Sequence, residues 1–133
     1  MTATDLLQAW LALEHEAVWL YPVIGARRAD LVDRATTSFE AHRDTRDALQ
    51  ARLRSAGVEP VPGKLSYNVG TVTTSGEAMA AAQTVEADIS AVCLALTGVV
   101  EGDARRYAIR HLTRAALAEI TWGATPRAFP GLP

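Results

Sequence analysis

The sequence predicts an all-α protein, an up-down bundle of four helices with one long crossover between the second and the third. Alanine supplies 25 of the 133 residues, and β-branched residues gather in one short stretch, which favours helix over strand. Apolar residues recur at helical spacing in four segments, whereas residues 57–75 lack that period. A chain of this length forms one domain, so we assign residues 1–133 to a single bundle.

The first helix is predicted to begin near Thr2 or Thr4. Thr2 and Asp5 stand at the spacing of a capping box, with Asp in place of the usual Glu. Pro22 is expected to bend this helix without ending it. Its apolar face comprises Leu6, Trp10, Leu13, Ala17, Leu20 and Ile24.

The second helix is predicted over residues 31–55, with Gly57 just past its end. Opposite charges four residues apart, such as Asp30 with Arg34 and Arg43 with Asp47, indicate a solvated outer face. Its inner side comprises Leu31, Ala35, Phe39, Leu49 and Leu53.

The third helix is predicted to begin at Thr74 or Ser75, because Glu77 completes a capping box with Thr74. The fourth runs from about residue 104 to 122, with Asp103 as the expected N-cap. A tail of about residues 123–133 follows, and we expect its two large apolar side chains to hold it on the bundle. These two side chains are Phe129 and Leu132. On the third helix, the residues predicted to face the core are Met79, Ala82, Ile89, Cys93 and Leu96.

The lengths of the connections predict the topology. Short loops make the first two helices one antiparallel hairpin and the last two another. The second helix would be about 38 Å long, and the extended link after it can reach up to about 60 Å. The link can therefore cross the whole bundle and start the third helix parallel to the second, a one-crossover arrangement.

Ionisable residues interrupt the apolar stripes at positions that should face the core: Glu14, His42 and Glu86. Glu14 lies about 14 residues before the first turn and His42 about 14 after it, so both should lie at one level. In the second hairpin Glu86 lies about 14 residues before the turn and His111 about 11 after it. His111 is therefore less well aligned with Glu86 than His42 is with Glu14.

Three segments carry a family resemblance: WLALEHEAVWLY at residues 10–21, AHRDTRDAL at residues 41–49 and WGATPRAFPGLP at residues 122–133. Together they resemble the ferritin-like domain-of-unknown-function family of actinobacteria. Membership implies a ferritin-like helical bundle and no established reaction.

Ferritin-like bundles build dinuclear metal sites from one Glu on each of two helices and a Glu-x-x-His motif on each of the other two. Glu14 and Glu86 match the lone glutamates. The two motifs, however, are reduced to their histidines, His42 and His111, and both bridging carboxylates are missing. A dinuclear oxidase would therefore lack ligands and negative charge.

One interpretation is therefore a metal-binding or redox protein that holds iron or manganese with inner-face ligands. The ligands would be Glu14, His42, Glu86 and His111. Such a site could be mononuclear or an atypical dinuclear one, with Tyr21 nearby as a redox-active or supporting group.

The other interpretation, which we prefer, is a structural ion-pair network in a non-catalytic protein with a degenerate metal site. Buried carboxylates need partners, and Arg46, Arg110 and Arg114 lie on helices near enough to neutralise Glu14 or Glu86. The protein would then act by self-association or by binding an unidentified protein partner.

Trp19 falls off the apolar stripe, so it is expected to lie either at an interface between subunits or under the crossover. A second apolar stripe of this kind favours a homodimer. His15 and Glu16 are expected at the surface or an interface, and Cys93 as a buried apolar side chain.

Composition narrows the remaining classes of partner. Thirteen basic and fifteen acidic residues give a net charge of −2, so neither nucleic acid nor an anionic membrane is an expected partner. The longest nearly uncharged stretch, residues 89–100, is too short to span a bilayer, and no secretory signal pattern precedes it. We therefore expect a cytoplasmic protein.

One cysteine excludes an intrachain disulfide. No phosphate-binding loop and no catalytic triad order in the sequence points to a substrate.

Overall fold

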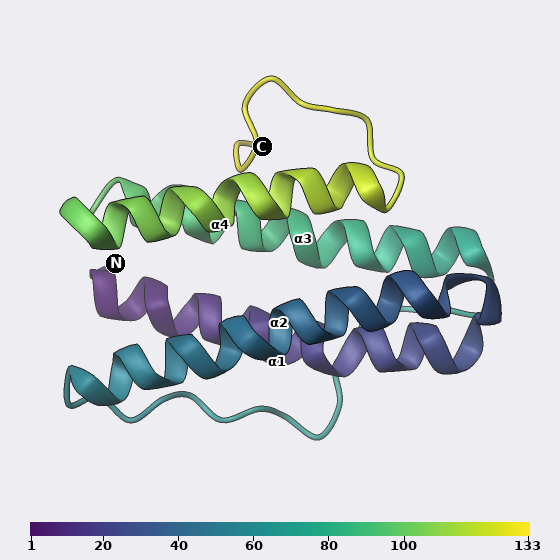
Figure 1. The fold of residues 1–133 in the computed structure, drawn as a ribbon, viewed down its shortest axis with the longest axis horizontal. Helices are drawn as coiled ribbons and strands as arrows, with labels where there is room; N and C mark the ends of the chain where they lie inside the picture. Colours follow the sequence, from purple (N-terminus) through teal and green to yellow (C-terminus); the bar gives the residue numbers. More distant parts are fainter.

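The computed structural model describes residues 1–133 and contains four α-helices and no strand (Figure 1). The all-α prediction is therefore confirmed. The helices are α1 (Ala3–Arg27), α2 (Val32–Ser55), α3 (Ser75–Thr97) and α4 (Gly102–Thr121), and a short 3-10 helix, η1 (Ala29–Leu31), lies between α1 and α2.

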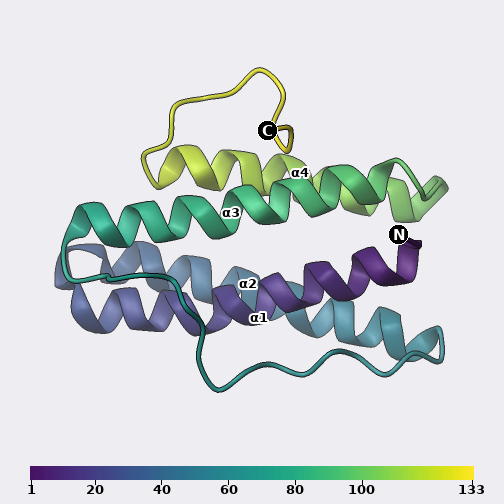
Figure 2. The same ribbon diagram turned by 180° about the vertical axis from the view of Figure 1, so that it is seen from behind.

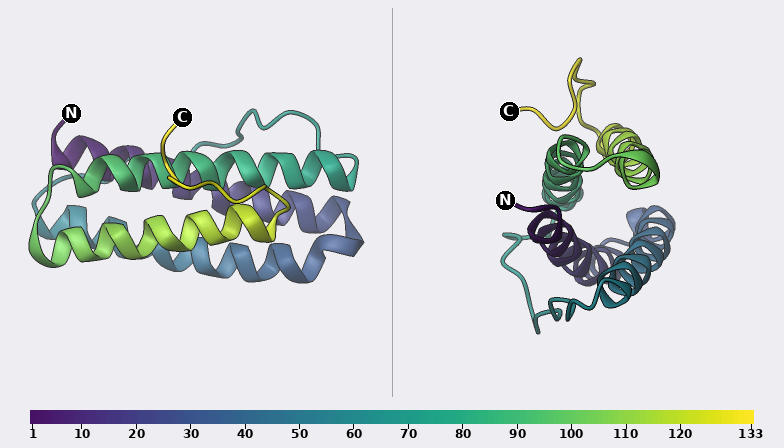
Figure 3. Two further views of the ribbon diagram at one scale, coloured as in Figure 1. Left: turned by 90° about the horizontal axis from the view of Figure 1, so that it is seen from above. Right: turned by 90° about the vertical axis from the view of Figure 1, so that its left-hand side faces the viewer.

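The four helices form a bundle of two antiparallel hairpins. The crossover, residues 56–74, leaves the end of α2 and runs along the outside of the bundle to the opposite end, where α3 begins (Figures 1 and 2). As a result α3 runs parallel to α2. The helix α1 packs against both α2 and α3, and α4 packs against α3 (Figure 3). The predicted four-helix bundle with a long crossover between the second and third helices is confirmed.

Both predicted capping boxes are present. The Thr2 hydroxyl accepts a hydrogen bond from the Asp5 amide, and the Asp5 carboxylate accepts one from the Thr2 amide. Thr74 and Glu77 make the same reciprocal pair at the start of α3. Pro22 lies inside α1, which continues for five more residues to Arg27.

The start of α4 differs from the prediction. Glu101 is the N-cap, with no side-chain capping bond, and the helix begins at Gly102. Gly102 has a φ of +58°, a left-handed conformation that glycine adopts at little cost, so the chain turns into the helix early. The prediction of Asp103 as N-cap is therefore wrong, and Asp103 lies in the first helical turn.

The core is centred on α1 and α3. Trp10, Tyr21 and Ile24 of α1 are fully buried, as is Cys93 of α3. By length and composition alone α3 could cross a membrane. In the bundle it packs on both α1 and α4 and carries a buried carboxylate, Glu86.

The crossover is held on α1 by polar contacts. The Gln8 side chain donates to the Glu59 carbonyl and accepts from the Val61 amide, both at 2.8 Å. His15 Nε2 lies 2.9 Å from the Val61 carbonyl oxygen. Trp19 packs against Tyr67 of the crossover, with ring centroids 5.9 Å apart. The crossover thus covers Trp19, as one of the two sequence interpretations predicts.

The C-terminal tail is held differently from the prediction. Phe129 and Leu132 are 72% and 51% exposed, so the expectation that they anchor the tail is wrong. The tail instead docks through Arg127, whose guanidinium bonds both carboxylate oxygens of Glu119 at 3.1 and 3.2 Å. Gly131 also lies so close to α3 that a Cβ there would come 2.9 Å from the Ser90 carbonyl oxygen.

Candidate functional site

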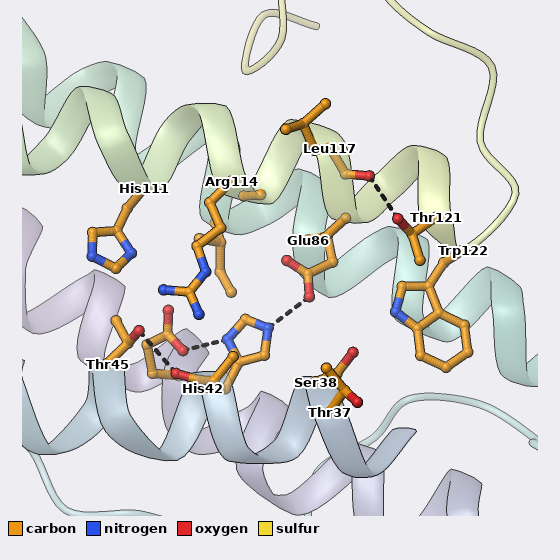
Figure 4. Close-up of a pocket in the computed structure, with 15 residues that line it drawn as sticks. Thr37, Ser38, His42, Thr45, Glu86, His111, Arg114, Leu117, Thr121 and Trp122 are labelled. Atoms are coloured by element: carbon orange, nitrogen blue, oxygen red, sulfur yellow. Dashed lines mark hydrogen bonds and ion pairs between the residues drawn. The ribbon is translucent and has the colours of Figure 1, made fainter. Parts of the chain in front are cut away.

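Three helices bring one ionisable side chain each to the centre of the bundle. His42 of α2 lies between Glu14 of α1 and Glu86 of α3 (Figure 4). Its Nδ1 is 2.5 Å from Glu14 Oε2, and its Nε2 is 2.6 Å from Glu86 Oε1. Both carboxylates are 1% exposed, so this Glu14–His42–Glu86 network is inside the protein.

The positions of these three residues follow from helical register. Glu14 and His42 lie at matching distances from the first turn, and the structure places them in direct contact. Glu86 is one turn after Ala82 and three residues before Ile89, both buried in the core, so its side chain points into the bundle.

Two aromatic side chains complete the hydrogen bonding of the carboxylates. Trp10 Nε1 donates to Glu14 Oε1 at 2.9 Å, and the Tyr21 hydroxyl donates to Glu86 Oε1 at 2.6 Å. The Tyr21 ring also stacks on the His42 imidazole at a centroid distance of 5.4 Å. The network is therefore fixed by packing as well as by charge.

The electrostatics of the network favour a protonated histidine. Burial acts to lower the pKa of His42, but the charges of Glu14 and Glu86 outweigh it and raise that pKa to about 10. Burial and the Glu86 carboxylate raise the pKa of Tyr21 well above its usual value. At neutral pH one imidazolium therefore lies between two carboxylates, and a neutral phenol donates to one of them.

His111, the fourth predicted ligand, stays apart from this network. Its ring lies 5.1 Å from that of Trp10 and 4.5 Å from that of Tyr107, and it makes no hydrogen bond to either carboxylate. Burial, followed by the nearby charges of Arg114 and Arg110, lowers its pKa to about 4. The structure thus brings together three of the four predicted residues, and His111 only lines the same cavity.

That cavity, of about 290 Å³, opens between α2 and α4, with Glu14, His42 and Glu86 in its lining. Its polar lining includes Ser38 and Thr45 of α2. The remaining lining residues are Thr37, Ala41, Ile89, His111, Arg114, Ala115, Leu117, Ala118, Thr121 and Trp122 (Figure 4).

Two cation–π contacts join α2 to the two ends of α4. The Arg52 guanidinium lies 3.8 Å from the ring centroid of Tyr107, near the start of α4. That of Arg34 lies 5.2 Å from the ring centroid of Trp122, at its end. The cavity lies along the part of the α2–α4 seam between these contacts.

The arginines expected to neutralise the inner glutamates do not do so, and that prediction is wrong. Arg46 pairs with its neighbour Asp47 at 2.9 Å, and Arg110 lies over the Tyr107 ring. Arg114 lines the cavity and makes no ion pair within 4.0 Å. His42 reaches both carboxylates from its place at their level, so its one positive charge is shared between them without an arginine.

Sequence reasoning missed Trp10 as a hydrogen-bond donor, because its place on the apolar stripe explained it as core. The signal was present, since Trp10 precedes Glu14 by four residues and residues at that spacing meet on a helix face. The unpartnered nitrogen of Trp122 was also missed, and no local pattern marks it.

The arrangement does not fit the dinuclear metal site of ferritin-like bundles. Both ring nitrogens of His42 are bonded to carboxylates, and Phe39 and Ala108 occupy the positions of the bridging glutamates. As placed, no group of three or more His, Cys, Asp or Glu side chains could hold a metal ion. Iron or manganese at Glu14, His42, Glu86 and His111 remains a prediction.

The fold and its inner residues define a small all-α four-helix bundle with a buried Glu–His–Glu network. Residues 6–133 match the model of a domain of unknown function, DUF4439, and the chain belongs to this family. The chain is also similar to the crystal structure of a conserved hypothetical protein, rv2844, from Mycobacterium tuberculosis. The two are 25% identical with a TM-score of 0.83, over 95% of this chain and 94% of the other. No curated protein matches the sequence. The biochemical role of the chain is therefore unknown.

Proposed function

We propose that this protein is a non-catalytic, ferritin-like bundle whose metal site has become a structural ion network. The observation that carries the proposal is the pair of bonds from His42 to Glu14 and Glu86 through both ring nitrogens. In this view His42 supplies the positive charge that a metal ion supplies elsewhere. The kinship with ferritin-like proteins, the actinobacterial origin and the cytoplasmic location belong to the same proposal.

The energetics of burial support this role. Two carboxylates inside a helical bundle need a cation and hydrogen-bond donors, and here they have His42, Trp10 and Tyr21. A metal ion that used His42 as ligand would have to displace a ring proton and break one of two short bonds. The network therefore competes with metal binding.

The protein would act by association, as a homodimer or with another protein. The outer face of α4 supports this part of the proposal, because Ile109, Leu117 and Ile120 are 46%, 60% and 42% exposed. They lie along one stripe of the helix at spacings of eight and three residues.

Sedimentation of the wild type and of Ile120→Glu tests self-association through this stripe. We expect a dimer that the substitution weakens, and a wild-type monomer at all concentrations would overturn it.

Elemental analysis tests the structural role of the network. The purified chain is loaded with iron, manganese or zinc, desalted, and compared with His42→Ala and with His15→Ala as the matched control. We expect no stoichiometric metal in any of the three proteins. About one ion per chain in the wild type and in the control, lost in His42→Ala, would overturn the proposal.

Such a result would establish the second candidate, a metal-binding or redox protein. One observation favours it, namely that three predicted ligands, Glu14, His42 and Glu86, already meet and that His111 lines the same cavity. The carboxylates and imidazoles would suit iron or manganese, which would supply redox chemistry when bound. Tyr21 would then hold its proton toward Glu86 beside the site.

A further inference from the structure

The cavity between α2 and α4 contains hydrogen-bonding capacity that the ion network does not use. Trp122 lines the cavity and is fully buried, yet its Nε1 has no hydrogen-bond partner. The nitrogen-bearing edge of its indole faces the side of the cavity where Glu86 and Ser38 lie (Figure 4). Because a buried donor without a partner costs free energy, this nitrogen marks a position suited to an acceptor atom.

A charged donor lies toward the other end of the cavity. The Arg114 side chain reaches from α4 into the space between His111 and His42 (Figure 4). It makes no ion pair, since Glu14 and Glu86 are bonded to His42. The guanidinium is therefore free to bind an oxyanion, and its planar fork matches a carboxylate.

The surrounding charge on the α2–α4 seam is also positive. Arg34 and Arg52 of α2 lie over the aromatic rings of Trp122 and Tyr107, and neither pairs with a carboxylate within 4.0 Å. A small anion approaching the seam from outside therefore meets two arginines that no carboxylate pairs with. The lining of the cavity also includes small and apolar side chains, namely Ala41, Ile89, Ala115 and Ala118.

We propose that this cavity binds a small organic acid. Arg114 holds its carboxylate, the Trp122 N–H donates to a second oxygen such as a ketone, and a short hydrocarbon body lies along the alanine-rich walls. The volume of about 290 Å³ is at the lower end of the range of small-molecule sites. Binding of this ligand does not require a metal-free network, because neither Arg114 nor Trp122 belongs to the Glu14–His42–Glu86 network.

The indole N–H signals in ¹H–¹⁵N spectra test the proposal with 4-oxopentanoate as probe. The chain has three tryptophans, and their signals are assigned with Trp19→Phe and Trp122→Phe. We expect a saturable shift of the Trp122 signal and none of the Trp19 signal. Pentanoate, which lacks the ketone, and pentan-2-one, which lacks the carboxylate, should each bind more weakly.

A matched pair of variants tests the role of the guanidinium. Arg114→Gln should weaken 4-oxopentanoate binding by about tenfold or more, because a charge-assisted bond is lost. Arg110→Gln, one turn earlier on α4 and over the Tyr107 ring, should leave binding within about twofold. Circular dichroism checks that both variants are folded.

The proposal would be overturned by no saturable Trp122 shift with the oxo acid, or by equal binding by wild type and Arg114→Gln. Tighter binding of pentan-2-one than of the acid would also overturn it. None of these results bears on metal content, so the failure of this inference and the failure of the proposed function are distinguishable.

Discussion

The two hairpins of the bundle each carry an inner glutamate and an inner histidine, but the two histidines have opposite environments. In the α1–α2 hairpin His42 bonds its own hairpin's Glu14 and also Glu86 of the other hairpin. In the α3–α4 hairpin His111 bonds neither carboxylate and lies among Trp10, Tyr107 and arginines. Two similar sets of residues therefore produce one ion network with a single histidine.

Helical register decides which histidine becomes the cation. A spacing of about 14 and 14 residues from the turn places Glu14 and His42 side by side, whereas about 14 and 11 leaves His111 out of step with Glu86. Once His42 holds both carboxylates, no carboxylate remains for His111. Its pKa falls to about 4 while that of His42 rises to about 10.

The largest expected difference between the two histidines is in the stability lost when each is replaced by alanine. His42→Ala leaves two buried carboxylates without a cation, and we expect a loss of about 3–5 kcal/mol in the free energy of unfolding. His111→Ala removes partly buried ring packing and no ion pair, so its loss should be less than half as large. Urea denaturation at pH 7 measures both. Equal losses would contradict the account.

The second test removes the positive charge of His42 by raising the pH. The pKa of His42 is raised from 6.5 in the unfolded chain to about 10 in the fold, so folding takes up a proton between these values. The stabilisation is complete below about pH 6.5 and is lost as the pH rises to about 10. Urea midpoints of the wild type should fall between pH 7 and 10 and approach those of His42→Ala. Parallel profiles of the two proteins would contradict this.

A smaller effect distinguishes the two tyrosines beside the histidines. Tyr21→Phe removes the donor to Glu86, and we expect a loss of about 1.5–3 kcal/mol, the value of a hydrogen bond to a charged group. The Tyr107 hydroxyl is buried and has no partner, so Tyr107→Phe should leave the free energy of unfolding unchanged or raise it. Thermal unfolding of the two variants measures the difference, and a reversed order would argue against the network.

The last effect concerns His111 in acid. Its pKa is lowered from 6.5 to about 4, so the unfolded chain binds the extra proton in this range. The stabilisation is complete above about pH 6.5 and decreases as the pH falls toward 4. His111→Gln should therefore have a flatter stability profile than the wild type between pH 6.5 and 4. An identical slope in both would show that His111 has an ordinary pKa.

Much of the fold could be predicted from local pattern. The capping boxes at Thr2 and Thr74 set two helix starts, and the long aperiodic link determined the crossover topology. The contact between Glu14 and His42 followed from counting residues to the turn. These features depend on spacing along the chain, which a sequence displays directly.

What could not be predicted depends on contacts between distant segments. The tail docks through Arg127 and Glu119, although Phe129 is the larger apolar residue and lies exposed. Arginine partners for the glutamates were expected because arginines are abundant on the helices. One histidine at the right level serves both carboxylates instead, and only the three-dimensional arrangement of α1, α2 and α3 makes this visible.

The protonation state of His42 in the folded chain can be measured directly. A ¹⁵N NMR titration of the three histidine rings, assigned with His42→Ala and His111→Ala, measures each pKa in the folded chain. We expect both His42 nitrogens to stay protonated at neutral pH and this ring to titrate near pH 10. His42 titrating near 6.5, with one ring nitrogen unprotonated at pH 7.5, would contradict the claim that an imidazolium joins Glu14 to Glu86.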